Sequence, residues 1–345
     1  MAETQSSKRD RAGLPRSRMA DVARLAGVSM TTVSRALRKP DIVSPEVRSR
    51  IDEAIERLSY RRNLVAGALA SAHSSTIGVI IPSIINSFFA ATIEALEEGM
   101  AGSGYQLMLG NTGYSAEAER QLVSSFLAWS PAAMVLTGRR HEGETVRALL
   151  TSHIPVFEMW ELSDHPIDMI VGFSHRSVGQ LVFRHFAERG ARRLGFIGAY
   201  MDRDYRTVDR HAGFVEAALQ AGFAAPAEIR LAERASAMGG AHGLAELMAR
   251  DPKVDAVFCS NDMIALGALF EAGRLGLSVP KQLKICGFGD LEFAAASEPP
   301  LTTVRPPGRE IGVQIARLLR ARLEGTIEGG GSFDLGVELV PRAST

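Results

Sequence analysis

From residue 77 onward, apolar runs of strand length alternate with amphipathic segments of helix length, and this alternation constrains the fold more than any other feature. Such alternation predicts parallel sheets covered by helices on both faces. Roughly 270 residues hold more strands than one small sheet needs. We therefore expect two doubly wound α/β subdomains, with a ligand cleft at the carboxyl ends of the strands. The eight runs are "IGVIIP", "YQLMLGN", "AAMVLTG", "PVFEMW", "MIVGF", "RLGFIGA", "AVFCSN" and "LKICGFG".

The chain carries no recognisable signature of an enzyme. There is no P-loop, no G-x-S-x-G elbow and no metal-spaced histidine cluster, and "GFGDLE" lacks the third glycine of a dinucleotide site. We therefore predict no catalytic residue, no metal and no cofactor, and keep a Rossmann-type sugar-acid enzyme as the alternative. Seven scattered histidines are expected to be surface or helix residues rather than catalysts: His141, His153, His165, His175, His185, His211 and His242.

The sequence shows neither a membrane-spanning segment nor a secretory signal. No apolar run reaches the roughly 18 residues of a membrane span, and the start "MAETQSSKRDRAGLPRSR" has no apolar segment of a secretory signal. We expect a cytoplasmic protein without a membrane partner. Cys259 and Cys286 stand in apolar runs, which favours buried free thiols over a disulfide.

The zero net charge of the 345 residues conceals a division between a basic head and an acidic body. Residues 1–72 carry 14 Lys and Arg against 8 Asp and Glu, so this part has a net charge of +6 and the remainder −6. A basic head on an acidic body indicates a polyanionic partner for the head alone. An exported ligand-binding protein or transport component, the rival interpretation, is expected to lack a basic head.

Residues 18–62 have the pattern of a helix-turn-helix followed by a supporting helix. In "MADVARLAGVSMTTVSRALRK", Gly27 separates two short amphipathic segments and supplies the positive φ of a tight turn, while Ser29 can cap the second segment. The third segment begins at Ser44-Pro45, a cap followed by an N1 proline.

The outward face of the second segment suits the major groove of DNA. Hydroxyls can reach phosphates or base edges, guanidinium groups can pair with guanine or phosphate, and a methionine can touch a thymine methyl. A solvated face of an ordinary three-helix core is the alternative, and the charge excess argues against it. The candidate DNA-contacting residues are Met30, Thr31, Thr32, Ser34, Arg35 and Arg38.

Together, "MADVARLAGVSMTTVSRAL" and "VSPEVRSRIDEAIERLSYRRN" resemble the headpiece of the lactose-repressor family of bacterial transcription factors. The resemblance continues in "SSTIGVIIPSIINSFFA", "VDAVFCSNDMIALGAL", "VPKQLKICGFGD" and "PPLTTVRPP" and covers residues 18–342. Within the family, "GYQLMLGNTGY" and "MIVGFS" are most similar to the branch that regulates gluconate operons.

The resemblance implies four segments. Residues 1–17 form a disordered tail, 18–62 the helix-turn-helix headpiece, 63–75 a hinge helix and linker, and 76–342 a periplasmic-binding-protein-like domain for effector binding and dimerisation. It also implies that the body's two subdomains exchange strands. In the hinge, "NLVAGALASA" matches a helix that orders over the minor groove, where Asn63 contacts DNA and Leu69 wedges into a base step. A plain linker is the alternative.

The candidate effector site combines residues that follow strands with a pair of arginines. By its position in "DRHAGF", Arg210 corresponds to the arginine that holds the effector in the family, and Arg206 lies one helical turn earlier. For Arg206, a surface residue paired with Asp202 or Asp209 is equally open. The strand-end candidates are Ser83, Phe88, Phe89, Phe173, Asn261 and Asp290.

The same residues favour an anionic ligand. Phe288-Gly289-Asp290 stands where many sugar-binding relatives have Tyr-Asp-Asp, so one acid expected for neutral sugars is missing. An arginine pair also suits a carboxylate or phosphate. We therefore expect a homodimeric repressor that binds a pseudo-palindromic operator and is released by gluconate or a ketogluconate, with a sugar phosphate or neutral sugar as alternatives. No heptad tail for tetramers follows "VELVPRAST".

Overall fold

The structure, a computed structural model, describes residues 17–38, 40–60, 74–85 and 87–345. The chain divides into two compact units, Met1–His73 and Ser74–Thr345, here called the headpiece and the body.

The headpiece contains the expected helix-turn-helix and supporting helix. Gly27 ends the first helix in the left-handed conformation, with φ 65° and ψ 39°, and its N–H donates back to that helix. The Ser29 hydroxyl accepts from the Thr32 N–H at 3.1 Å and so caps the second helix. The elements are α1 (Met19–Ala26), α2 (Met30–Arg38), a 3₁₀ turn η1 (Pro40–Ile42) and α3 (Pro45–Arg57).

One apolar core holds these three helices together. Val22, Val33 and Ile51, one from each helix, are fully buried in it. The small side chain of Ala23 is buried between them and lets α1 and α2 cross closely. Val28, in the turn between α1 and α2, and Leu37 of α2 pack against this core and are partly buried.

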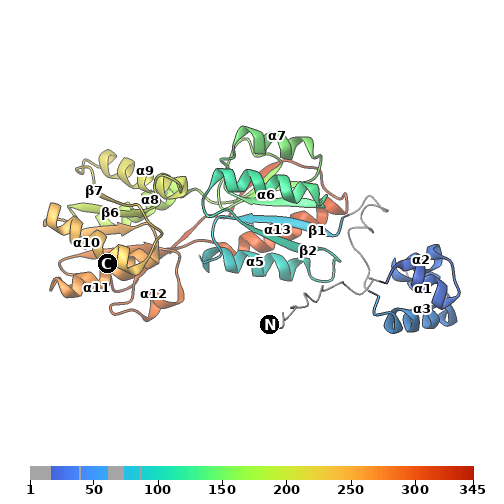
Figure 1. Cartoon of the computed structure of the whole chain (residues 1–345). Coiled ribbons are helices and arrows are strands. Elements are labelled where there is room, and N and C mark those ends of the chain that lie inside the picture. Colours follow the sequence, from blue (N-terminus) through green and yellow to red (C-terminus); the bar gives the residue numbers. More distant parts are fainter. Residues whose placement is uncertain (1–16, 39, 61–73, 86) are drawn as a thin grey trace, which may run out of the picture. The chain divides into compact units, whose positions relative to one another are not determined.

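The body consists of two α/β subdomains, each built on a six-stranded sheet (Figure 1). The first sheet has the order β11-β5-β4-β3-β1-β2, and all its strands are parallel. Its strands are β1 (Thr76–Ile81), β2 (Gln106–Asn111), β3 (Ala133–Thr137), β4 (Val156–Met159), β5 (Met169–Gly172) and β11 (Gly331–Asp334).

The second sheet has the order β12-β10-β9-β8-β6-β7, and only β12 runs antiparallel to its neighbour. Its strands are β6 (Leu194–Ala199), β7 (Ala227–Leu231), β8 (Ala256–Cys259), β9 (Lys284–Phe288), β10 (Thr302–Arg305) and β12 (Glu338–Val340).

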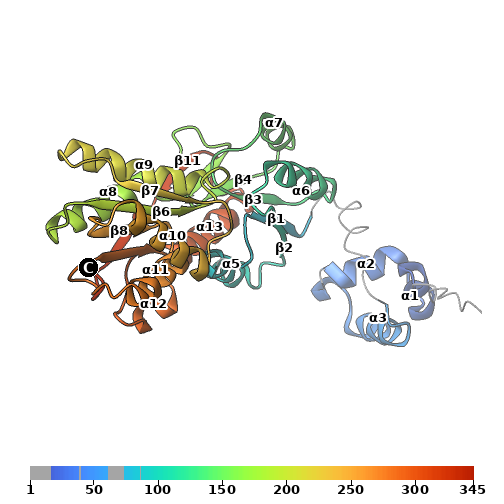
Figure 2. The ribbon, with the colours of Figure 1, turned by 60° about the vertical axis from the view of Figure 1, so that its left-hand side comes forward.

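Helices cover both faces of each sheet, as Figures 1 and 2 show. α5 and α13 pack against each other on one face of the first sheet, and α6 and α7 cover the other. Arg320 of α13 donates to the carbonyls of Gly99 and Ala101 at the C-terminal end of α5. These helices are α5 (Ser87–Met100), α6 (Ala116–Ala128), α7 (Gly143–Thr151) and α13 (Gly308–Leu323).

The second sheet is covered in the same way. α8 packs on α9, and α10 packs on α11. The short helix α12 follows β9. The bounds are α8 (His175–Glu188), α9 (Tyr205–Gln220), α10 (Ala237–Arg250), α11 (Asp262–Arg274) and α12 (Glu292–Ala296).

The chain passes between the subdomains three times. It crosses from β5 into α8, from β10 into α13, and from β11 to β12. The strand exchange implied by the family resemblance is therefore present, and the predicted fold class is confirmed. A body with three crossovers can change the angle between its subdomains only by bending these segments together.

The eight apolar runs all form strands, but the alternation missed four others. β7, β10, β11 and β12 were not predicted, and three of them, β7, β11 and β12, lie at sheet edges. Gly331, the last of three consecutive glycines, begins β11. β11 gains its order from pairing with β5 rather than from burial of its own side chains.

Some predictions concern residues outside the described part of the chain. The tail up to residue 16 and the hinge residues Asn63 and Leu69 lie outside it, and so does the side chain of Arg38. Among the described residues, no helix is both long and apolar enough to cross a membrane. Cys259 and Cys286 are free and buried, as expected.

Candidate effector pocket and DNA-binding face

A pocket of about 90 Å³ lies between the two subdomains, at the carboxyl ends of their strands. The first subdomain contributes residues that follow β1, β2 and β4, and the second contributes residues that follow or end β6, β8 and β9. This is where a doubly wound fold places its ligands. A pocket of this volume suits a small polar molecule.

Six of the eight predicted effector residues line this pocket: Ser83, Phe88, Phe89, Arg206, Arg210 and Asn261. Phe173 lies behind it, with its ring 4.6 Å from the His175 ring and 5.9 Å from that of Trp160. Asp290 is instead paired with Arg305 and Arg342, both at 2.6 Å. These pairs join β10 and the C-terminal segment to the end of β9.

Several lining residues were not predicted. Trp160 and Tyr200 follow strand ends directly and Tyr114 lies in the turn after β2, so the reasoning that selected Ser83 would also have selected them. All three have positive φ values, 65°, 71° and 51°, which are costly for side chains of this size and are typical of functional sites. The Tyr114 and Tyr200 rings come from different subdomains and lie 5.8 Å apart.

Arg206 is buried, not a surface residue, and it pairs with Asp204 rather than with Asp202 or Asp209. Its Nε lies 3.0 Å from Asp204 Oδ1, and the rings of Phe89, Tyr114 and Tyr205 surround its guanidinium within 6.0 Å. Burial opposes the charge, but Asp204 and its other neighbours outweigh it and raise the pKa of Arg206. This arginine is a fixed cation with its own counter-ion.

Arg210 is buried as well, but all its hydrogen-bond partners are neutral. Nη1 donates to His175 Nδ1 at 2.9 Å, and Nη2 donates to Thr207 Oγ1 and to the Ser260 carbonyl at 2.9 and 3.2 Å. The guanidinium lies 4.3 Å over the Phe288 ring. Burial, with a contribution from Arg206, lowers the pKa of Arg210 to about 10, while Asp204 and Asp209 act in the opposite direction. The group therefore stays charged at neutral pH, with no carboxylate among its hydrogen-bond partners.

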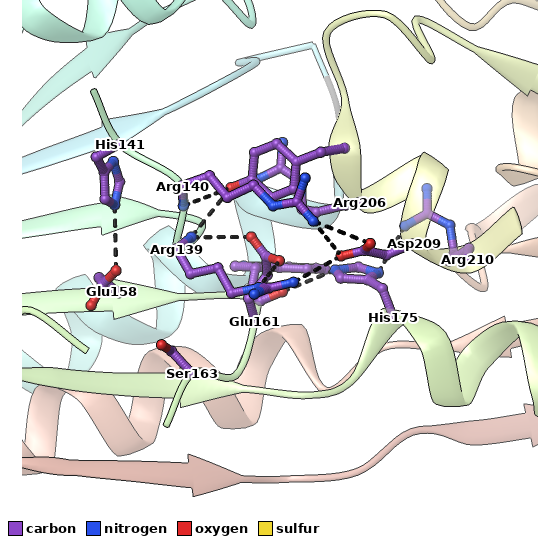
Figure 3. A network of polar contacts seen from close by, with 12 residues as sticks. Arg139, Arg140, His141, Glu158, Glu161, Ser163, His175, Arg206, Asp209 and Arg210 are labelled. Carbon is purple, nitrogen blue, oxygen red and sulfur yellow. Dashed lines mark hydrogen bonds and ion pairs between the residues drawn. The ribbon is translucent and has the colours of Figure 1, made fainter. Parts of the chain in front are cut away.

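A polar network joins the subdomains beside the pocket (Figure 3). Arg139, from the loop after β3, donates to the buried Glu161 at 3.1 Å and to Asp209 of α9 at 3.1 Å. Arg140 reaches Asp209 at 3.3 Å and lies 4.6 Å over the Tyr205 ring. Glu161 also stabilises the Arg206 charge. The network therefore interacts with the pocket through the charges of Glu161 and Arg206.

His141 lies apart from the pocket, and the prediction that it is a surface or helix residue was wrong. Its side chain is 1% exposed, with Nδ1 2.7 Å from Glu119 and Nε2 3.5 Å from Glu158. Burial alone would lower the pKa of His141, but the two carboxylates raise it to about 9. The imidazolium thus bridges α6 and β4 as a buried cation.

His141 should make stability depend on pH in the alkaline range. The folded-state pKa of about 9 exceeds the ordinary 6.5, so its contribution is complete below pH 6.5 and is lost as the pH rises to 9. Urea unfolding should show a loss of about 3 kcal/mol across this range, and His141→Gln should remove most of that dependence. His153→Gln, at an exposed position, is the control. An unchanged pH dependence in His141→Gln would contradict the assignment.

In the headpiece, α2 presents the predicted DNA-binding face. Met30 is 56% exposed, Thr31 and Arg35 are exposed, and Thr32 and Ser34 are half-buried. Ser29 and Thr32 are hydrogen-bonded at 2.9 Å, which orders the start of the helix. The face combines hydroxyls, an exposed guanidinium and a methionine on a rigid helix.

The arrangement of the pocket supports binding rather than catalysis. Within the described ranges, no group of three or more His, Cys, Asp or Glu side chains could hold a metal ion. The ionisable side chains that line the pocket are three arginines, one aspartate, two tyrosines and His175, whose pKa burial lowers well below 6.5. Such a set neutralises an anion and holds hydroxyl groups.

Comparisons with known proteins agree with this geometry. Residues 18–63 match the model of bacterial regulatory proteins of the lacI family, and residues 183–345 match a periplasmic binding protein-like domain. The chain is 37% identical to the HTH-type transcriptional regulator GntR of Pseudomonas aeruginosa, over 94% of each chain.

Two solved structures are also similar. A transcriptional regulator of the same family from Silicibacter pomeroyi superimposes with a TM-score of 0.88 at 30% identity, covering 95% of this chain and 99% of that one. The transcription regulator GntR from Chromobacterium violaceum gives a TM-score of 0.74 at 38% identity, covering 78% of this chain and 98% of that one.

Proposed function

The chain belongs to the lacI family of bacterial regulatory proteins, and on that premise we propose that it is a cytoplasmic repressor of sugar-acid utilisation genes. A homodimer binds a pseudo-palindromic operator and is released when gluconate or a ketogluconate enters the pocket of each body. Since its relatives are transcriptional regulators, the chain is a regulator rather than an enzyme.

The lack of a carboxylate among the hydrogen-bond partners of the buried Arg210 is the observation that carries the effector proposal. Arg206 is already paired with Asp204, whereas the three hydrogen-bond partners of Arg210 are neutral. Arg210 therefore has no carboxylate in direct contact, although Asp204 and Asp209 stabilise its charge from further away, and a ligand carboxylate can supply that contact. A phosphate dianion would bring a second negative charge that has no buried partner. The charge balance thus favours a monocarboxylate over a sugar phosphate.

The remaining lining groups suit the hydroxyls of a sugar acid. Asn261 and Thr207 come from the second subdomain, and Ser83 comes from the first. Each side chain can donate to or accept from a hydroxyl group. Because the partners belong to both subdomains, a bound ligand favours one angle between them, as in other hinged binding domains.

Operator binding is assigned to α2 and to the segment that follows the headpiece. One helix-turn-helix reads one half-site, so two headpieces are needed for a palindrome. The hinge residues Asn63 and Leu69 complete the proposal, with the two hinge segments meeting over the minor groove. Effector and operator then weaken each other by the same factor.

Arg35→Ala tests the DNA-binding face. The variant should bind the DNA upstream of its own gene about tenfold more weakly or worse, because an exposed guanidinium that reaches a base or phosphate is lost. Mobility shifts at several salt concentrations measure this. Arg184→Ala removes the same charge from an exposed position on α8 of the body and should bind normally. Equal affinities for the two variants would refute the assignment of α2.

A further inference from the structure

His175 lines the effector pocket, between the two subdomains of the body. Figure 3 shows it next to Arg210. It is the first residue of α8 and only 4% exposed. Nε2 is 3.0 Å from the carbonyl oxygen of Trp160, which follows β4 of the first subdomain. Nδ1 is 2.9 Å from Nη1 of Arg210, on α9 of the second subdomain. One imidazole therefore joins the two halves of the body.

The two partners fix the protonation of the ring. A carbonyl oxygen only accepts hydrogen bonds, so Nε2 carries the proton and donates to Trp160. A guanidinium only donates, so Nδ1 is unprotonated and accepts from Arg210. His175 is thus a neutral Nε2–H tautomer. Burial, together with the adjacent Arg210 and Arg206, lowers its pKa well below 6.5, in agreement with this assignment.

Packing holds the ring in that orientation. The Phe173 ring lies 4.6 Å from the imidazole and the Phe288 ring lies 6.0 Å from it. Of the groups that contact Arg210, Thr207, Ser260 and Phe288 all belong to the second subdomain. His175 differs from these groups because it also forms a hydrogen bond with a backbone carbonyl of the first subdomain, that of Trp160.

We propose that His175 is a positioning residue for the effector: it aims the Arg210 guanidinium at the ligand carboxylate and ties that orientation to the first subdomain. This inference rests on the proposed function, in which Arg210 holds the carboxylate. Neither the sequence motifs nor the family resemblance indicated His175, since it was expected to be only a surface or helix residue.

Two substitutions separate the hydrogen bonds of the ring. His175→Asn places a carbonyl oxygen near the position of Nδ1 and keeps an acceptor for Arg210. His175→Gln places an amide near the position of Nε2, so it keeps the donor to Trp160 and loses the acceptor. Each variant loses one buried hydrogen bond, so a purely structural role would impair both alike.

Calorimetric titration of the full-length protein with potassium gluconate, alongside thermal unfolding, tests the proposal. His175→Gln should bind gluconate at least about tenfold more weakly, and His175→Asn, which keeps the acceptor for Arg210 but loses the tie to Trp160, should lose clearly less affinity than His175→Gln. Equal losses in both variants, or no loss in His175→Gln, would overturn the positioning role. Normal binding by Arg210→Ala would instead contradict the proposed function.

A measurement without ligand decides the same question independently. Nitrogen-15 NMR of the histidine-labelled protein, with His175→Asn identifying the signal, should show a neutral Nε2–H tautomer throughout the range from about pH 5 to about pH 8. A His175 signal that titrates in this range would overturn the inference. Failure of gluconate to bind at all would contradict only the proposed function and leave this result to decide the role of His175.

Discussion

Arg210→Ala should abolish the response to gluconate while operator binding stays within about twofold of the unaltered protein's, because the pocket and the headpiece are separate units. The substitution removes the one buried pocket cation whose hydrogen-bond partners are all neutral. Calorimetry should show a loss of gluconate affinity of about 100-fold or more, as for other charged partners of a buried ligand.

An intermediate substitution and a control variant help to interpret that result. Arg210→Lys keeps the charge but not the planar fork, so it should fall between Arg210→Ala and the unaltered protein. Arg230→Ala removes an exposed arginine from β7 and should change neither gluconate nor operator binding. If Arg210→Ala is folded by thermal unfolding and still responds to gluconate, the carboxylate does not bind at Arg210.

Gly179→Ala is expected to destabilise the body strongly. A Cβ at this position of α8 would stand 2.0 Å from the Arg210 carbonyl oxygen and 2.4 Å from the Phe214 nitrogen, both backbone atoms of α9. The two helices would have to separate. Overpacking of this kind costs about 3 kcal/mol. Because Arg210 lies at the contact, gluconate binding should weaken in the same variant.

Urea unfolding followed by circular dichroism measures this effect. Gly273→Ala is the matched control: this glycine is also helical, on α11, but no atom lies within 4 Å of its Cβ position. It should be neutral or up to about 1 kcal/mol more stable, because alanine favours helix. If Gly179→Ala unfolds at the same urea concentration as the unaltered protein, the close contact of α8 and α9 does not carry the stability assigned to it.

Much of the fold followed from local patterns. Seven of the eight predicted strands lie inside the sheets, and their apolar sequences reflect burial on both faces, whereas β2 lies at an edge and is largely exposed. Gly27, Ser29 and Pro45 mark helix ends through their own backbone or side-chain chemistry. The missed strands β7 and β11 carry charged or exposed residues, and their order depends on a partner strand.

Some pocket residues could likewise be predicted from the sequence, and others could not. Residues such as Ser83 and Asn261 could be selected because they follow strands, which meet at one edge of each sheet. The role of His175 depends on Trp160 and Arg210, and the pairing of Asp290 depends on Arg342, 52 residues away. Such contacts arise from tertiary packing, which no local pattern encodes.

The same limit applies to Arg206. Both sequence-based alternatives were consistent with its spacing from Arg210, because residues one turn apart share a face whether that face is buried or exposed. Its burial among three aromatic rings decides between them, and those rings come from α5, α9 and the turn after β2.

Release of the operator by a sugar acid tests the account most directly. Fluorescence anisotropy of labelled DNA from upstream of the protein's own gene gives the operator Kd with gluconate, 2-ketogluconate, gluconate 6-phosphate or glucose added separately. Gluconate or 2-ketogluconate should raise that Kd by about tenfold or more, while glucose leaves it unchanged. An operator Kd that neither acid changes would contradict the proposal that this protein is a sugar-acid-responsive repressor.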